Sequence, residues 1–196
     1  MKPFSQACEN NKQPILECLQ GVFTTPGLVL EIGCGTGQHA EFLAARLPHL
    51  RWQPTDHPES LGDCKERLRS AALTNVLPPL ALDVAAKAWP IDSADGAFSA
   101  NTAHIMGWPA VQAMFLGLGT VLGEGAAFCL YGPFNFQGSF TSDSNRMFDR
   151  QLRSRAAHMG IRYIEDLQDL AALSGFVLAA DHAMPANNRL LVWRRT

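Results

Sequence analysis

The chain has 196 residues, and 47% of them are hydrophobic, which is enough to form a buried core without disulfides. Its 16 basic and 18 acidic residues give a formal net charge of −2 and are mixed along the sequence. A nucleic-acid partner is disfavoured, because phosphate binding depends on clustered Lys and Arg side chains.

The cysteines are scattered, with no C-x-x-C pair and no Cys/His spacing typical of a metal site. They indicate reduced thiols and no bound metal. The N-terminal segment lacks the pattern of a signal peptide, and no stretch reaches the roughly 20 apolar residues of a membrane helix. We therefore expect a cytoplasmic protein with no membrane contact; the sequence leaves the oligomeric state open.

Strand-like and helix-like runs alternate along the chain, beginning with an apolar run at residues 28–32. An amphipathic segment at 38–47 follows and predicts a helix. Further strands are expected at 50–55, 76–82, 96–101 and 126–131, and further helices at 60–72, 111–122 and 145–157. In the 60–72 helix we expect the charged side chains on the solvent face: Asp63, Lys65, Glu66, Arg67 and Arg69.

The end of the chain departs from this alternation. Apolar runs at 176–181 and 189–194 flank a Pro-Ala-Asn-Asn turn that leaves no room for a crossover helix, which predicts an antiparallel hairpin. The pattern therefore predicts an α/β, Rossmann-like three-layer sandwich with a seven-stranded, mostly parallel sheet and an antiparallel C-terminal hairpin strand. We expect one domain over 1–196, with 1–25 as a helical N-terminal extension.

A glycine-rich loop, Glu31-Ile32-Gly33-Cys34-Gly35-Thr36-Gly37, follows the first strand and opens a helix. In doubly wound folds a nucleotide-like ligand meets the backbone at this position. A dinucleotide loop requires glycine where this chain has Gln38. Glu31 would repel a pyrophosphate, yet it suits a phosphate-free cofactor with a cationic sulfonium and ammonium.

Acidic residues after the next two strands support a cofactor site. Asp56 is placed to accept hydrogen bonds from ribose hydroxyls, and Asp83 to accept one from an adenine amino group. The plainer alternative is that the glycines only turn the chain and that both acids cap helices. Cys34 is interpreted as a small loop residue near the cofactor rather than a nucleophile. The expected cofactor contacts are Asn11, Glu31, Gly33, Cys34, Gly35, Gly37, Asp56, His57, Asp83, Val84 and Asn101.

The loop, the two acids and the reversed final strand resemble a class I S-adenosylmethionine-dependent methyltransferase over nearly the whole chain. More narrowly, the sequence resembles the methyltransferase-like 26 family, whose function is unassigned. The resemblance implies S-adenosylmethionine as cofactor and S-adenosylhomocysteine as product. At Ala156-Ala157 the family tends to have an acidic residue and proline, so no role of that acid transfers. The matching blocks are 9–16, 101–105, 132–135, 140–145, 148–149, 152–153, 159–162 and 165–167.

Candidate substrate residues follow the later strands, where open α/β sheets bind ligands. His104 is the candidate catalytic residue, which would orient or deprotonate a hydroxyl or amine; its alternative role is a hydrogen bond that organises the turn. Tyr131 is either a pocket residue or a core aromatic. Arg153 meets an anionic substrate or lies on a solvated helix face. The candidate substrate-binding residues are Tyr131, Asn135, Asn145 and Arg153.

The N-terminal extension is expected either to cover the cofactor as a lid, with Asn11 or its neighbours in contact, or to pack on the sheet edge. The leading function is methylation of a small-molecule acceptor at O or N, by in-line displacement. The alternative is an S-adenosylmethionine-binding protein with regulatory or lost activity. A nicotinamide-dependent oxidoreductase is disfavoured by the loop spacing and by Glu31.

Overall fold

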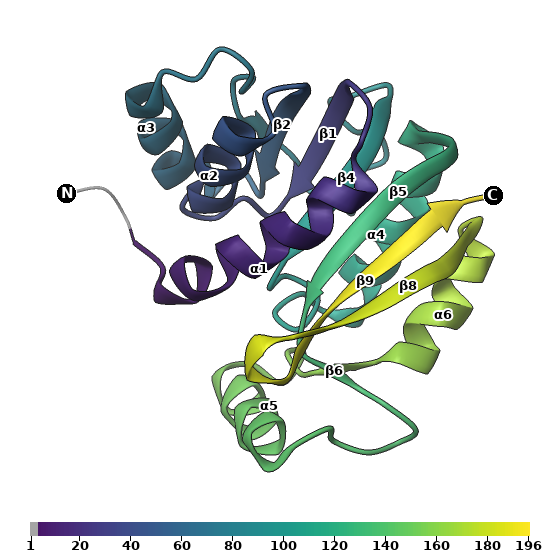
Figure 1. Cartoon of the computed structure of the whole chain (residues 1–196). Helices are drawn as coiled ribbons and strands as arrows, with labels where there is room; N and C mark the ends of the chain where they lie inside the picture. The colour runs from purple at the N-terminus through teal and green to yellow at the C-terminus, as the bar shows by residue number, and fades with distance from the viewer. Residues whose placement is uncertain (1–3) are drawn as a thin grey trace.

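The computed structural model describes residues 4–196, so residues 1–3 of the expected N-terminal extension lie outside it. At its centre is a seven-stranded sheet in the order β3-β2-β1-β4-β5-β9-β8 (Figure 1). In that order the strands are Leu80–Ala81, Leu50–Asp56, Gly27–Ile32, Ala94–Ala100, Leu122–Gly132, Asn188–Arg195 and Phe176–Met184.

The direction of the strands confirms the predicted fold class. β1 pairs in parallel with β2 and β4, β2 with β3, and β4 with β5. β9 is the one reversed strand, because it pairs antiparallel with both β5 and β8. The turn between β8 and β9 is a short 3₁₀ segment, Pro185–Asn187, within the stretch predicted to form the hairpin turn. The parallel strands end together at one edge of the sheet, and this edge carries the candidate site.

Helices cover both faces of the sheet and complete the three layers (Figure 1). α1 (Gln6–Val22), α2 (Gln38–Arg46) and α3 (Leu61–Ala71) share one buried cluster with the sheet, while α4 (Trp108–Val121) and α6 (Ile164–Leu173) share the other. α5 (Asp143–Arg155) lies beyond the strand ends, near the two-stranded sheet of β6 (Phe134–Asn135) and β7 (Arg162–Tyr163).

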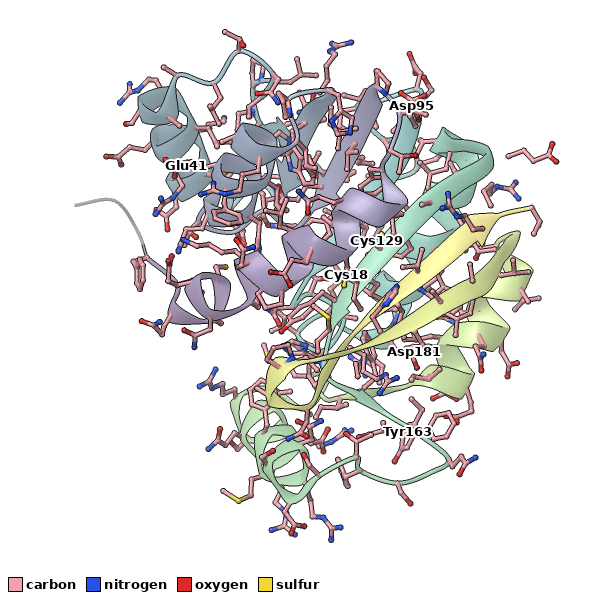
Figure 2. All side chains as sticks on the ribbon, in the orientation of Figure 1. Cys18, Glu41, Asp95, Cys129, Tyr163 and Asp181 are labelled. Atoms are coloured by element: carbon pink, nitrogen blue, oxygen red, sulfur yellow. The ribbon has the colours of Figure 1, made fainter. Side chains whose placement is uncertain are left out.

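The contact between α1 and the sheet is apolar and close. Cys18 of α1 packs against the cluster that contains Cys129 of β5, and Figure 2 shows the two side chains together at this contact. Burial raises the pKa of both thiols, so both are protonated, apolar side chains. α1 is therefore anchored over the centre of the sheet, between its two halves.

The predicted third strand at 76–82 is wrong in extent. Only Leu80–Ala81 forms β3, and Val76 makes an isolated bridge to Trp52. Between them lie Pro78 and Pro79, which have no N–H to donate and so interrupt the ladder.

The prediction that Arg67 lies on a solvent face is also wrong. Arg67 is buried, donates from Nε to the carbonyl of Thr36 at 2.8 Å, and pairs with Glu41 at 2.7 Å. Its guanidinium ties α3 to the glycine loop and to α2, which outweighs hydration because the charge is paired and hydrogen-bonded. The periodicity of the sequence also left α6, β6 and β7 unpredicted.

Candidate functional site

The glycine loop connects β1 to α2 in a conformation that its glycines permit. Gly33, Gly35 and Gly37 have φ values of +75°, +53° and +73°, which L-residues with a Cβ rarely adopt. The N–H groups of Gly33 and Cys34 both donate to the carbonyl of Thr55 at 2.9 Å, which fixes the loop against β2. A Cβ at Gly33 would lie 2.4 Å from Thr102, whereas a Cβ at Gly35 would have no neighbour within 4 Å. The loop is therefore packed at Gly33 and open at Gly35.

A cavity of about 480 Å³ lies over the open side of this loop. It contains six of the residues expected at the cofactor: Gly33, Cys34, Gly35, Asp56, His57 and Asn101. No Lys or Arg is among its lining residues in the described chain, and Asp56 supplies its carboxylate. The remaining lining residues are Ser5, Ala7, Cys8, Thr36, His39, Ser60, Ala100, Thr102, Ile105 and Met106.

Asp56 is the last residue of β2, and its side chain lines the cavity. Its Oδ2 accepts the N–H of Gly35 at 2.6 Å, and its Oδ1 accepts the N–H of His57 at 2.7 Å. A carboxylate offers about four lone-pair positions, so each oxygen retains capacity for a further donor. Asp56 can therefore order the loop and accept hydroxyl groups of a ligand at the same time.

Glu31 differs from the expectation. Its side chain is 1% exposed, is not part of the cavity lining, and accepts the indole N–H of Trp52 at 2.7 Å. Burial raises the pKa of Glu31 to about 7, against the opposing effect of the Trp52 hydrogen bond. The predicted direct contact of Glu31 with a cationic cofactor is thus not supported by its position beneath the loop.

Cys34 lies in the loop and lines the cavity, but it is not placed as a nucleophile. Its thiol is buried, and a hydrogen bond with Cys64 together with this burial raises its pKa far above the usual range. A thiol that stays protonated is a poor nucleophile. Its position fits the interpretation of Cys34 as a small loop residue.

Gln38 at the start of α2 is hydrogen-bonded to Ser5, the residue that precedes α1. The amide of Gln38 accepts the N–H of Ser5 and donates to the Ser5 carbonyl, and the Thr36 hydroxyl donates to the same amide oxygen. Gln38 occupies the position where a dinucleotide loop has glycine. Here its side chain connects the residue before α1 to the start of α2.

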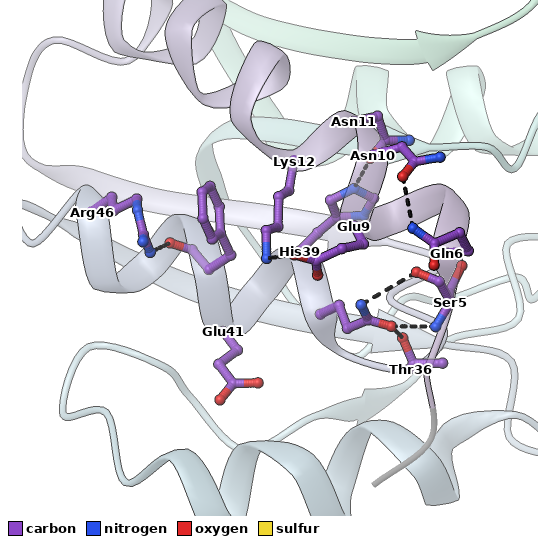
Figure 3. Close-up of polar contacts among 12 residues, drawn as sticks. Ser5, Gln6, Glu9, Asn10, Asn11, Lys12, Thr36, His39, Glu41 and Arg46 are labelled. Atoms are coloured by element: carbon purple, nitrogen blue, oxygen red, sulfur yellow. Dashed lines mark hydrogen bonds and ion pairs between the residues drawn. The ribbon is translucent and has the colours of Figure 1, made fainter.

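Asn11 approaches the site without lining the cavity. It is buried in α1, and its Oδ1 lies 2.7 Å from Nε2 of His39 in α2 (Figure 3). Its neighbours Ser5, Ala7 and Cys8 do line the cavity. His39 was not among the residues expected from the sequence, although its place in the first turn after a glycine loop is the signal that would have identified it.

Three further expected cofactor residues lie outside the cavity lining. Gly37 is the N-cap of α2 in a left-handed conformation. Asp83 accepts the N–H of Ala85 at 2.9 Å and caps a local turn, while Val84 packs into the cluster with α4. The peptide after β3 does approach the site, since Leu82 donates to the carbonyl of Asp56 at 2.8 Å.

Most of the expected substrate residues have internal partners. Asn145 donates to Thr141 at 2.9 Å and to the carbonyl of Asn187 at 3.1 Å, which joins α5 to the turn before β9. Arg153, 52% exposed, donates to Asp149 at 2.8 Å on the same helix. Asn135 is buried, and its Oδ1 has no partner among the described residues. Burial raises the pKa of Tyr131, and its polar neighbours Asn11 and Asn188 oppose this effect.

His104 does not face the cavity. Its ring is 7% exposed and packs edge-on against Phe148 of α5, with ring centroids 5.4 Å apart. Burial, with a smaller effect of Arg162, lowers the pKa of His104 to about 4. Its carbonyl accepts the N–H of Gly160 at 2.9 Å. His104 therefore packs in the core beside α5, outside the cavity lining.

Residues 4–196 contain neither a cluster of metal-binding side chains nor a membrane-spanning helix. No group of three or more His, Cys, Asp or Glu side chains is gathered as a metal ion would require. No helix in this range combines the length and apolar character needed to cross a membrane.

Three solved structures that share this fold are methyltransferases. An O-methyltransferase family 2 protein from Planctomyces limnophilus, in complex with apigenin, matches with a TM-score of 0.82 and 15% identity, covering 95% of this chain and 57% of that one. The apo form of the S-adenosylmethionine-dependent methyltransferase SibL matches with 0.79 and 19%, covering 96% and 55%. CalO1, a methyltransferase of calicheamicin biosynthesis in its SAH-bound form, matches with 0.73 and 14%, covering 94% and 55%.

Sheet order, reversed β9 and glycine loop together define a Rossmann-like fold of the class I methyltransferase type. The chain spans little more than half the length of the three structures named above. It belongs to the family described as "Protein of unknown function (DUF938)", whose model matches residues 2–195.

Proposed function

We propose that the cavity over the glycine loop binds S-adenosylmethionine and that the protein transfers its methyl group to a small-molecule acceptor. The observation that carries this proposal is the chemistry of the cavity lining. Asp56 lines the cavity, Gly35 leaves the backbone open, and no Lys or Arg lines the cavity in the described chain. Such a lining favours a ribose-containing cofactor without phosphate groups.

The residues present fit this cofactor. The two oxygens of Asp56 retain lone pairs for ribose hydroxyls after accepting Gly35 and His57. The amide of Gln38 and the first turn of α1 occupy the start of α2, where a pyrophosphate would bind. The wall formed by Ile105 and Met106 is apolar and suits the uncharged parts of the cofactor.

When bound, S-adenosylmethionine supplies a methyl group already activated by its sulfonium. The chain's own residues then bind and orient: Asp56 fixes the ribose end, the loop backbone approaches the cofactor, and α1 limits the access of water. Positioning dominates such a displacement, and a base is required only for an acceptor that must lose a proton.

The acceptor class and the narrower family are also part of this proposal. The similar structures named above include an O-methyltransferase family protein solved with apigenin, which supports a small organic acceptor with O or N as the methylated atom. Membership of the methyltransferase-like 26 family is proposed on the sequence blocks that resemble it. We further propose that 1–196 forms one domain and that 1–25 acts as the lid, since Ser5, Ala7 and Cys8 line the cavity.

A second function shares the same cavity: an S-adenosylmethionine-binding protein without turnover. The position of His104 favours it, because the candidate catalytic residue lies outside the cavity lining. Methyl transfer into a fractionated small-molecule extract, followed with S-adenosylmethionine labelled on the methyl group, separates the two. Label incorporated into a small molecule supports the enzyme, and binding without incorporation supports the second function.

Calorimetry with S-adenosylmethionine, S-adenosylhomocysteine and NADH tests the cofactor. We expect both adenosyl ligands to bind and NADH not to bind. Asp56→Ala should weaken binding by about 1 to 3 kcal/mol, the cost of lost hydrogen bonds to a charged group. Asp92→Ala is the matched control, because Asp92 is an exposed carboxylate outside this cavity. Tight NADH binding without a response to S-adenosylmethionine would refute the proposal.

A further inference from the structure

Buried polar residues from three elements meet beside the cavity. His39 of α2 is 4% exposed and lines the cavity, Asn11 of α1 is buried behind it, and Tyr131 of β5 is buried behind Asn11. Nε2 of His39 lies 2.7 Å from Oδ1 of Asn11, and the side chains of Asn11 and Asn188 are polar neighbours of Tyr131. Buried polar groups cost free energy unless they are paired, so this arrangement is specific.

The contact between His39 and Asn11 fixes which ring nitrogen of His39 carries the proton. Asn11 directs its Oδ1 at His39, which leaves its amide nitrogen for Tyr131, whose pKa burial raises against the opposing effect of this contact. Its Oδ1 only accepts, so Nε2 of His39 must carry the proton. Nδ1 then bears a lone pair, and no donor to it is present among the described residues. Burial, with a smaller effect of Lys12, lowers the pKa of His39 to about 4 and keeps the ring neutral.

The sheet order locates His39 at the end of the cavity away from Asp56. Asp56 ends β2, and the strands continue from β2 through β1 to β4 and β5. The His39 ring packs edge-on against Phe98 of β4 at 5.7 Å, and its partner Asn11 reaches Tyr131 of β5. With its ribose at Asp56, a cofactor would have room for its aminoacyl chain at the His39 end of the same cavity.

Glu31, the carboxylate expected to meet the cationic end of the cofactor, lies outside the cavity lining. We propose that Nδ1 of His39 accepts a hydrogen bond from the ammonium group of the bound cofactor, and that Asn11 and Tyr131 are positioning residues that hold the ring in the required tautomer. This inference rests on the proposed function. The neutral imidazole supplies an acceptor without adding a second cation to the site.

Calorimetry with two ligands tests this assignment. S-adenosylhomocysteine carries the aminoacyl chain, and 5′-methylthioadenosine shares its adenosine thioether but lacks the ammonium. His39→Gln retains an N–H that can reach Asn11 but places no acceptor at Nδ1. We expect this variant to bind S-adenosylhomocysteine about 10-fold more weakly. Binding of 5′-methylthioadenosine should change less than about twofold, which also shows that the variant is folded.

His49→Gln is the matched control, because His49 bonds to the carbonyl of Phe23 away from the cavity. It should change neither affinity. Equal losses for both ligands in His39→Gln, or no loss for either, would overturn the role of His39 and leave the proposed function standing. Failure of the wild-type protein to bind either ligand would instead overturn the proposed function, and this inference with it.

Nitrogen NMR of labelled imidazole tests the positioning residues directly. At neutral pH we expect the His39 signals of an Nε2–H tautomer in the wild-type protein. In Asn11→Leu the fixed tautomer should be lost, and in Tyr131→Phe it should be weakened, while the shifts of His49 stay unchanged. A protonated ring or an Nδ1–H tautomer in the wild-type protein contradicts the proposal.

Discussion

The indole N–H of Trp52 donates a 2.7 Å hydrogen bond to Oε2 of Glu31, joining neighbouring strands beneath the glycine loop. This hydrogen bond favours the ionised carboxylate, but burial opposes it more strongly and raises the pKa of Glu31 to about 7. Glu31, which the sequence predicted to contact a ligand, is therefore a buried carboxyl group that titrates near neutral pH. Its charge state links the stability of the loop to pH.

Replacing Glu31 by Gln should change how stability depends on pH. The folded pKa is raised above the unfolded value of 4.5, so the stabilising contribution is complete below pH 4.5 and is lost as pH rises through 7. Relative to Glu31→Gln, the wild-type free energy of unfolding should fall by about 3 kcal/mol from pH 4.5 to above 7. Urea unfolding at several pH values measures this. The exposed Glu124→Gln should follow the wild type, and parallel curves for Glu31→Gln would contradict the assignment.

The sequence predicted what repeated local patterns determine. The apolar runs of β1, β2 and β4, the glycine loop and the terminal hairpin follow from residue spacing, and the structure confirms them. β3 is shorter than predicted because Pro78 and Pro79 interrupt its ladder. The prediction gave more weight to the apolar residues of this segment than to its two prolines.

Tertiary contacts determine what the sequence did not predict. Arg67 is buried because the Thr36 carbonyl and Glu41 converge on it from other elements. His39 and Asn11 lie 28 positions apart and meet only when α1 crosses the sheet. The sequence pattern places Glu31 in β1, but it does not show that the indole of Trp52 in β2 covers and hydrogen-bonds its carboxylate. Spacing identifies which residues end a strand but not where each side chain points.

His104 provides a second pH prediction of opposite sign. Burial lowers its folded pKa from 6.5 to about 4, so its contribution to stability is present above pH 6.5 and is lost as pH falls through 4. Relative to His104→Gln, the wild-type protein should lose about 3 kcal/mol of unfolding free energy between these limits. Denaturant titrations across this range test it, with the exposed His182→Gln as control. An unchanged slope in His104→Gln would show that the ring is accessible to protons in the folded state.

Gln38 should hold the first turn of α1 in place. Gln38→Ala removes its hydrogen bonds to Ser5 and Thr36, each worth about 1 kcal/mol. We expect about tenfold faster amide hydrogen exchange in the first turn of α1, with little change in the global unfolding free energy, because this turn opens locally. Gln13→Ala, which removes an exposed bond to Glu17 on the same helix, should leave that exchange unchanged. Equal exchange in both variants would argue against Gln38 as the anchor.

Gly33 and Gly35 should respond differently to alanine although both have positive φ. At Gly35 a Cβ meets no protein atom within 4 Å, so Gly35→Ala should cost only the left-handed backbone strain, about 1 to 2 kcal/mol. At Gly33 a Cβ would lie 2.4 Å from Thr102, so Gly33→Ala should cost at least about 1 kcal/mol more. Thermal and urea unfolding compare the two variants.

Gly35→Ala should also reduce ligand affinity without unfolding the protein. The methyl group of Gly35→Ala would project into the open space over the loop, so S-adenosylhomocysteine affinity should fall at least about tenfold while the variant stays folded. Gly21→Ala, a substitution in α1 with no neighbour within 4 Å, serves as control and should stabilise by about 0.5 to 1 kcal/mol. If Gly35→Ala binds like the wild type, the ligand does not approach the loop backbone at this position, and the cofactor must lie elsewhere in the cavity.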